Sequence, residues 1–513
     1  MHSRVISRVR AATTGAVAAG LVTVMTAAPL TALEVPDDKP GGLATAAQKV
    51  TRGPALDQAM QTSNMTVVGH SALGGGGLNA DVWEHRGYAY VGVWSGPCPA
   101  TGVKVADVRN PRNPRLVSRL RHPDKTSAED VVVRRVDTPR FTGDLAVVGI
   151  QTCGDPERGG VFRGLAFFDV TDPTHPRQIS RYRVNRDTIG CHEIDLAVSA
   201  DGRVLASCAN VFAEQITGSD EVIVVDATNP FRPRKVGGFA LGRDLGVDPA
   251  RNSDNVGCFS ASFAHSVRFN RAGRTLFASY WDYGTLRFRV RPDGGLRGPV
   301  GRTDVAPPDE DADNHSMTPA KHGDAMVVNL EDFSPVECGK RFQGWGDARV
   351  YTNHRGDNRL LSTFSTPNSR STRTDGFYSI HNTENAGSKS DQMFSSWYSD
   401  GIVWWSLANR RDPVKMGQFV PPPTEDPTGF FPAVPLVWGF TLIGPATSSL
   451  PAISTADYGS CAPRAWVTSE PAASRVTWAV AASPPANKVS AVQQALQRLF
   501  ELRCRVIFGQ RRP

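Results

Sequence analysis

The sequence predicts an all-β protein, a β-propeller of seven blades. Three observations support this prediction: a strand-turn-strand phrase that recurs about every 60 residues, a hairpin before each copy, and no helical period among the copies. A repeat of this length built from short strands is typical of propellers, in which each copy forms one blade. A single blade cannot bury both faces of its sheet, so the copies must stack into a ring.

The clearest copy of the phrase is LAFFDVTDPTHPRQISRYRV, at 165–184. Its first half is rich in apolar and aromatic residues and ends at Asp169. Pro173 and Pro176 then turn the chain, because proline fixes φ and donates no backbone hydrogen bond. Five further copies lie around Asp107, Asp226, Arg289, Tyr351 and Ser406, and the last three match the phrase only weakly.

An apolar strand that ends in Asp and continues into DPxxP resembles the LVIVD-repeat family. The resemblance covers roughly Asn64 to Gly439. It implies a secreted bacterial propeller with seven blades, and it implies almost no established chemistry.

Each copy follows a hairpin that would supply the inner strands of its blade, some with turn dipeptides such as Asp201-Gly202. We identify seven such hairpins, the last starting near Val434. The segment NMTVVGHSAL, from Asn64, precedes the first full blade. We expect it to close the ring as the outer strand of the seventh blade, which would hide an edge. The alternative is a free edge strand.

Residues 1–33 have the order of a signal peptide: three arginines, an uncharged run, and small residues at 26–28. The alternative is a membrane anchor, since the run could nearly span a bilayer, but its Gly, Thr and Ala content makes it weakly apolar. We therefore expect cleavage, no stable membrane span afterwards, and a secreted, extracellular or cell-surface location. Residues 34–63 are expected to form a flexible arm.

The formal net charge of +7 is concentrated at the two ends of the chain. Residues 1–33 carry +3 and residues 484–513 carry +5, which leaves −1 for 34–483. The pI near 9.0 therefore does not indicate a nucleic-acid-binding surface. The expected partner is an extracellular protein or a small ligand, and no nucleic acid.

Cysteine usage agrees with export, because an exported chain can oxidise its thiols. The chain has eight cysteines, of which six lie in the repeats. The first two occupy matching loops of neighbouring blades, the next two lie at opposite ends of one hairpin, and two remain. The expected disulfides are Cys98–Cys153, Cys191–Cys208 and Cys258–Cys338. A cysteine-ligated zinc site would need a CxxC spacing, which is absent.

The repeat fails in the last blade. The DYG at 457–459 matches the DYG at 282–284, but SCAPRAWVTSEP stands where an apolar strand should follow. Proline in a central strand removes a ladder hydrogen bond. We therefore expect the propeller to occupy 64–460 with a degenerate last blade, and 461–513 to be a non-propeller tail. Helical spacing from Val489 predicts an amphipathic helix there; a coding frameshift and a genuine extension both explain this tail.

The most informative residues open the successive inner strands. Four of these strands begin with histidine: His192, His265, His315 and His381. Innermost strands line the channel of a propeller, so equivalent positions should converge at one mouth. Neutral imidazole is the commonest ligand of Zn, Cu or Fe, which makes these four the candidate metal ligands.

The same level of the ring supplies five further candidates for a binding site at the channel mouth: Asp81, Glu129, Asp130, Glu193 and Trp438. Glu129 or Glu193 could orient an imidazole from outside the ligand set. Acids where the second strand meets the third, such as Glu331-Asp332, are expected instead to accept backbone hydrogen bonds in turns.

Two functions follow from these patterns. The first is a secreted LVIVD-type propeller that acts as an extracellular or cell-surface binding protein, with histidines that simply bond water or neighbouring loops. The alternative is a metal-dependent four-histidine enzyme, such as an oxidoreductase, with a transition metal as cofactor. No catalytic residue is predicted, because GxSxG, P-loop, HExxH and Rossmann motifs are absent.

Overall fold

The computed structural model describes the repeats and parts of both ends of the chain. The described residues are 61–71, 73–94, 102–152, 161–249, 262–303, 313–320, 323–332, 336–337, 341–342, 344–371, 373, 375–387, 390–423, 432–443, 452–455 and 467–468. The predicted signal peptide (1–33), the arm up to residue 60 and the predicted tail helix lie outside them.

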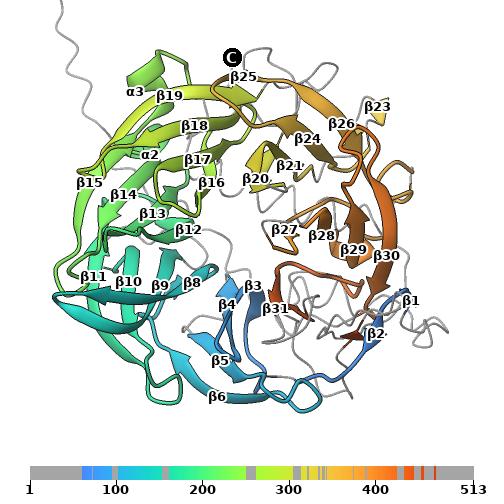
Figure 1. The fold of residues 1–513 in the computed structure, drawn as a ribbon, viewed down its shortest axis with the longest axis horizontal. Coiled ribbons are helices and arrows are strands. Elements are labelled where there is room, and N and C mark those ends of the chain that lie inside the picture. The colour runs from blue at the N-terminus through green and yellow to red at the C-terminus, as the bar shows by residue number, and fades with distance from the viewer. Residues whose placement is uncertain are drawn as a thin grey trace, which may run out of the picture.

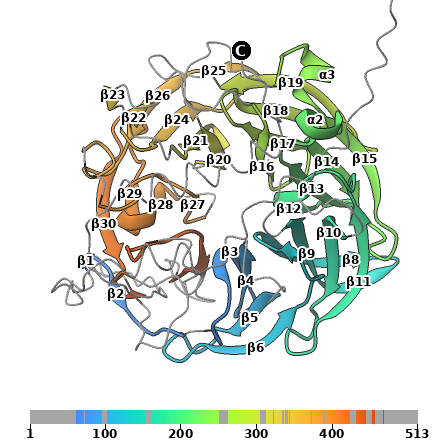
Figure 2. The same ribbon diagram turned by 180° about the vertical axis from the view of Figure 1, so that it is seen from behind.

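Antiparallel sheets stand around a central axis like the blades of a propeller, which confirms the predicted all-β propeller fold (Figures 1 and 2). Blade 1 consists of β3 (Leu78–His85), β4 (Tyr88–Trp94), β5 (Val103–Asp107) and β6 (Arg115–Leu120). Blade 2 consists of β8 (Val131–Thr138), β9 (Phe141–Thr152), β10 (Gly164–Asp169) and β11 (Arg177–Arg183), with β7 (Thr126–Ser127) added to β9. Blade 3 consists of β12 (Cys191–Val198), β13 (Val204–Asn210), β14 (Val222–Asp226) and β15 (Arg234–Phe239).

The next three blades repeat this order from the axis outward. Blade 4 consists of β16 (Ala264–Phe269), β17 (Thr275–Tyr280), β18 (Gly284–Val290) and β19 (Leu296–Thr303), with β25 (Gly356–Asn358) parallel to β19. Blade 5 consists of β20 (Asn314–Pro319), β21 (Ala325–Leu330), β24 (Ala348–Thr352) and β26 (Leu360–Phe364). Blade 6 consists of β27 (Thr383–Asn385), β28 (Gln392–Ser396), β29 (Ile402–Ser406) and β30 (Val414–Val420).

Short elements decorate the blades. They are α2 (Ala213–Thr217), α3 (Leu241–Leu245), the 3-10 turn η2 (Tyr398–Asp400), and the hairpin of β22 (Val336–Glu337) with β23 (Arg341–Phe342). Within the described part of the chain, no helix is both long enough and apolar enough to cross a membrane.

The expected seventh blade is not confirmed, because the described residues form six blades. Between blades 6 and 1 lie two two-stranded sheets: β31 (Phe440–Ile443) with β32 (Ala452–Thr455), and β2 (Thr66–Val67) with β33 (Val467–Thr468). Phe440 packs against blade 6, and Thr441 Oγ1 accepts a hydrogen bond from Glu84 N of blade 1 at 3.4 Å. The strand expected after the DYG turn begins where the sequence reads SCAPRAW, at 460–466, which lies outside the described residues.

The chain before blade 1 contributes two strands to the ring: β2, which belongs to the segment expected to close the seventh blade, pairs with β33 between blades 6 and 1, and a shorter strand precedes it in the predicted arm. β1 (Gln61–Ser63) pairs with β30, as a fifth, outer strand of blade 6. Asn64 then takes a left-handed φ of 53° and donates from Nδ2 to Met416 O at 2.6 Å, which turns the chain into β2. The predicted arm therefore ends in a paired strand, and residues 467–468 of the predicted tail pair with β2.

The Asp of the repeated phrase ends the third strand of a blade and caps the turn that follows. Asp169 Oδ1 accepts the backbone N–H of Thr171 at 3.1 Å, and Asp226 Oδ1 accepts that of Thr228 at 3.0 Å. Each Asp also pairs with an arginine that opens the next strand, at 2.7 Å between Asp226 Oδ2 and Arg234 Nη2. These contacts explain why the phrase pairs Asp with a proline-containing turn.

Middle strands are buried on both faces, because each sheet is packed between two neighbours. All seven residues of β13 are buried, as are the four aliphatic residues of β14. Successive side chains of one strand therefore belong to different clusters: Ala206 and Cys208 pack toward blade 2, whereas Leu205 and Ala209 pack toward blade 4. Packing between blades holds the inner strands in place around the axis.

One predicted disulfide is confirmed. Cys191 and Cys208 are bridged across β12 and β13, with their Cα atoms 5.4 Å apart. The other predicted pairings, Cys98–Cys153 and Cys258–Cys338, involve residues outside the described ranges and stay predictions.

Candidate functional site

A β-bulge lies where the inner strand begins in four of the blades. The pairing register shifts between Asn79 and Val82, Cys191 and Ile194, Ala264 and Ser266, and Asn314 and Ser316. A bulge sets two residues against one on the partner strand, so the usual alternation of side chains fails there. A histidine and the residue after it can therefore both face the axis. The dipeptides placed in this way are His192-Glu193, His265-Ser266 and His315-Ser316.

The four predicted histidines form a continuous row at the axis. Ring centroids are 4.4 Å apart for His192 and His265, 4.3 Å for His265 and His315, and 4.1 Å for His315 and His381. All four are buried, and none is more than 8% exposed. The structure thus brings together residues that span 190 positions of sequence, because the same place in each repeat faces the same axis.

Two of these imidazoles point nitrogens at each other. His192 Nε2 lies 3.0 Å from His265 Nε2. Two nitrogen ligands at about 2.1 Å from one metal ion and at right angles to each other would be roughly 3 Å apart. The pair is joined by an N–H···N hydrogen bond in the absence of an ion, and its separation also fits two neighbouring ligands of a single ion.

Carboxylates stand on the far sides of the same two rings. Glu129 Oε2 is 2.5 Å from His192 Nδ1, and Glu193 Oε1 is 3.8 Å from His265 Nδ1. Gln151 Nε2 holds Glu129 by a 2.8 Å hydrogen bond to Oε2. A carboxylate on the outer nitrogen fixes the ring and makes the inner nitrogen a better metal ligand. Glu129 thus occupies the orienting position predicted for it, whereas Glu193 Oε1 is too far from His265 Nδ1 for a hydrogen bond and lies closer to His315 Nε2.

The other half of the row is interleaved with carboxylates. His315 Nε2 lies 3.2 Å from Glu193 Oε1 and 3.6 Å from Glu331 Oε2. His381 Nε2 lies 3.7 Å from Glu331 Oε1, which also accepts a hydrogen bond from the Tyr398 hydroxyl. Glu331 is the one member of the cluster that we expected only as a turn residue. The signal for it was its place directly after β21, next to the inner strand of the same blade.

Within the described residues, two overlapping groups have donor atoms that all lie within 4.8 Å of one another. They are Glu193 with His315 and His381, and His265 with His315 and Glu331. The set mixes imidazole nitrogen with carboxylate oxygen, a combination suited to zinc and to divalent iron or copper. The residues present therefore fit a first-row transition metal.

Burial opposes charge at Glu331, Glu193, His315 and His381. It raises the pKa of Glu331 well above its usual value, and it raises that of Glu193, where Asp81 and Asp130 add to the effect. Burial also lowers the pKa of His315, and the neighbouring histidines lower it further. Without an ion, these residues favour their neutral forms. A divalent cation would supply the positive charge that lets the carboxylates ionise.

The predicted residue Trp438 covers the row of histidines. Its ring centroid is 5.1 Å from that of His381, 5.8 Å from Tyr398 and 5.2 Å from Trp94. Trp281 lies 5.2 Å from His265 in the same way. These aromatic rings pack as a buried cover beside the imidazoles.

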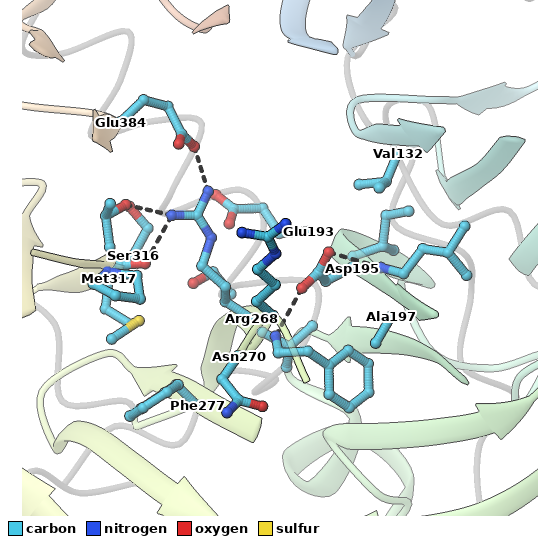
Figure 3. A pocket seen from close by; sticks show the side chains of 18 of the residues that line it. Val132, Glu193, Asp195, Ala197, Arg268, Asn270, Phe277, Ser316, Met317 and Glu384 are labelled. Atoms are coloured by element: carbon cyan, nitrogen blue, oxygen red, sulfur yellow. Dashed lines mark hydrogen bonds and ion pairs between the residues drawn. The ribbon is translucent and has the colours of Figure 1, made fainter. Parts of the chain in front are cut away.

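A cavity of about 1020 Å³ adjoins the row along the propeller axis (Figure 3). Asp81, Asp130 and Glu193 line it, and Asn382 Nδ2 donates to Asp81 Oδ1 at 2.7 Å. Burial raises the pKa of Asp130 to about 7. Arginines and a further glutamate line the cavity beyond these acids, with Arg268 and Glu384 in contact across it. The channel is therefore hollow on the polar side of the histidines.

No family model matches the sequence, and no curated protein matches it. Among solved structures, Sqt1 from Chaetomium thermophilum, bound to the N-terminus of the ribosomal protein L10, is 11% identical with a TM-score of 0.42, covering 72% of this chain and 79% of that one. The β-propeller domain of Cps50 (Swd1) from Myceliophteria thermophila is 12% identical with a TM-score of 0.40, covering 71% of this chain and 90% of that one. Likenesses of this size carry no argument about function, so the functional argument depends on the site itself.

Proposed function

We propose that this chain binds a divalent transition metal at the propeller axis and, beside it, a small molecule in the adjoining cavity. The observation that supports this most directly is the 3.0 Å separation of His192 Nε2 and His265 Nε2, with the Glu129 carboxylate on the outer nitrogen of His192. The proposal keeps the binding role expected from the sequence and adds the metal centre of the alternative.

The donors differ in the part that each would play. His192 and His265 would bind the ion through Nε2, while Glu129 holds the outer nitrogen of His192. Glu331, held by the Tyr398 hydroxyl, lies between His315 and His381 and would balance the charge of the ion. A bound metal would supply Lewis acidity. The chain's own residues would orient the ligands and keep the aromatic side free of water.

We further propose that the chain belongs to the LVIVD-repeat type, that it is exported, and that its ring has seven sectors. Export is supported by the signal-like order of residues 1–33 and by the Cys191–Cys208 bridge, since disulfides persist in oxidising compartments. The seventh sector would be the place between blades 6 and 1, where β31 and β32 lie.

The test is the metal content of untagged protein purified from its native secretion route, measured by inductively coupled plasma mass spectrometry. We expect about one first-row transition metal per chain in the wild type. His192→Ala and His265→Ala should lose it, whereas His175→Ala should keep it, because His175 lies in an exposed turn with 84% of its side chain accessible. Circular dichroism would show that each variant is folded.

A second measurement guards against loss of metal during purification. Metal-free protein titrated with Co²⁺ should develop visible absorption bands that saturate at one equivalent, and His265→Ala should show none. Wild-type protein that carries no stoichiometric metal and gives no saturable Co²⁺ spectrum would refute the proposal.

A further inference from the structure

The cavity beside the histidines changes in character along the axis. Its inner end is lined by the acids Asp81, Asp130 and Glu193, and further out it is lined by five arginines: Arg134, Arg135, Arg268, Arg271 and Arg287. Arg268 follows His265 by three residues on β16, so it stands about 10 Å farther along the channel. Arginine side chains are therefore concentrated about 10 Å from the proposed metal centre, a distance that a small organic molecule can span.

Arg134 offers hydrogen-bond donors to this space. Its guanidinium stacks on the Trp83 ring, 4.4 Å from the centroid, and its Nε donates to Leu196 O at 3.2 Å. Within the described residues, its terminal NH₂ groups have no hydrogen-bond acceptor. Burial lowers the pKa of this guanidinium; the charges of Arg268 and Arg271 lower it further, while those of Asp195 and Glu384 raise it. Like charges gathered in a partly desolvated cavity are stabilised by an anion placed among them.

Arg268 reaches across the cavity toward blades 5 and 6 (Figure 3). It donates to Met317 O at 3.4 Å and to Thr318 Oγ1, and it forms an ion pair with Glu384. These contacts fix the guanidinium in the channel. Glu384 is then the internal carboxylate that a bound anion would have to compete with.

We propose that this cavity binds a small organic anion, a molecule whose carboxylate or phosphate group is held by Arg134 and Arg268 and whose body extends toward the histidines. The volume of about 1020 Å³ is at the upper end of ligand sites, which is more than a free inorganic anion needs. Planar guanidinium groups bind carboxylate and phosphate with paired hydrogen bonds, so the chemistry of the wall selects this class.

This inference names the ligand of the proposed metal-dependent site, and only the position of the ligand beside the metal depends on that proposal. Anion binding at the arginines does not need the ion. Titrations of metal-free and metal-loaded protein therefore separate failure of one proposal from failure of the other.

The experiment is isothermal titration calorimetry at low ionic strength with a hexose phosphate, succinate, inorganic phosphate and uncharged glucose. We expect saturable binding of an organic anion at one per chain, weaker binding of inorganic phosphate, and none of glucose. Arg134→Gln should weaken binding at least about tenfold, since hydrogen bonds to charged groups contribute on that scale. Arg177→Gln is the matched control, because Arg177 lies on the outer strand β11 and pairs with Asp169.

A second variant distinguishes ligand contact from a structural role. Glu384→Gln removes the carboxylate that competes for Arg268, so it should tighten anion binding several-fold. A purely structural ion pair would give weaker binding or none in this variant. Absence of saturable binding by both organic anions, equal affinities in wild type and Arg134→Gln, or tighter binding of inorganic phosphate than of either organic anion would each overturn the proposal.

Discussion

The disulfide between Cys191 and Cys208 spans the bulge that places His192, and removing it should loosen that bulge. Cys191 precedes His192 directly, and Cys208 pairs in register with Ile194 on the far side of the bulge. The bridge therefore ties the two ends of the irregular segment to the regular strand β13. We expect the double variant Cys191→Ala/Cys208→Ala to be less stable and to bind metal more weakly.

The size of the effect follows from the length of chain that the bridge closes. The two cysteines are 17 residues apart in sequence. In the chain-entropy account, a loop of this length contributes about 3 kcal/mol at 25 °C by restricting the unfolded state. The two sulfurs are also fully buried, so replacing them with alanine methyl groups leaves a small cavity that adds to the loss.

Urea unfolding followed by tryptophan fluorescence, with and without reductant, measures this loss. Reductant should lower the stability of the wild type toward that of the double variant and leave the variant unchanged. Equal stability of the two proteins without reductant, or an equal shift of both with reductant, would show that the bridge does not constrain the unfolded chain.

Two further predictions concern contacts that hold the ring and its turns. A Cβ at residue 92 would stand 1.6 Å from Glu129 O, so Gly92→Ala should force blades 1 and 2 apart and lower the thermal unfolding midpoint, at a cost of about 3 kcal/mol; an unchanged midpoint would contradict this. The side-chain hydrogen bonds of Arg109 lower the pKa of Asp107, so the ionised Asp107 stabilises the fold above its unfolded-state pKa. Asp107→Asn should therefore be less stable than wild type in urea at pH 7, with a difference that shrinks as the pH falls below about 4; a difference that is constant with pH would argue against this.

Local chemistry could be predicted from the sequence because it lies within a few residues. The turn capped by Asp169 and Asp226 is one example, since the Asp, the proline and the arginine all belong to one phrase. The row of histidines is another, because the same position of each repeat occupies the same place in each blade. The pairing of Cys191 with Cys208 follows from one hairpin in the same way.

The parts that could not be predicted depend on residues far apart in the chain. The pairing of β2 with β33 joins segments about 400 residues apart, and no local sequence pattern predicts it. The position of Glu331 beside His315 depends on the bulge at the start of β20, which moves the histidine toward the end of β21. The contact of Arg268 with Glu384 crosses from blade 4 to blade 6, so neither residue stands out in its own repeat.

The bulges at the start of the inner strands have a consequence for how such a site can evolve. In a regular strand, one residue of each adjacent pair would point into the wall between blades, whereas here blades 3, 4 and 5 each offer a dipeptide to the axis. Neighbouring codons can then encode a donor and its companion, as in His192-Glu193 or His265-Ser266. The residues that face the axis can therefore change one blade at a time, by two adjacent substitutions. Such a change needs no new loop and leaves the packing of the ring intact. A deletion of one residue at a bulge would do the opposite, because restored alternation would turn one member of the pair away from the axis.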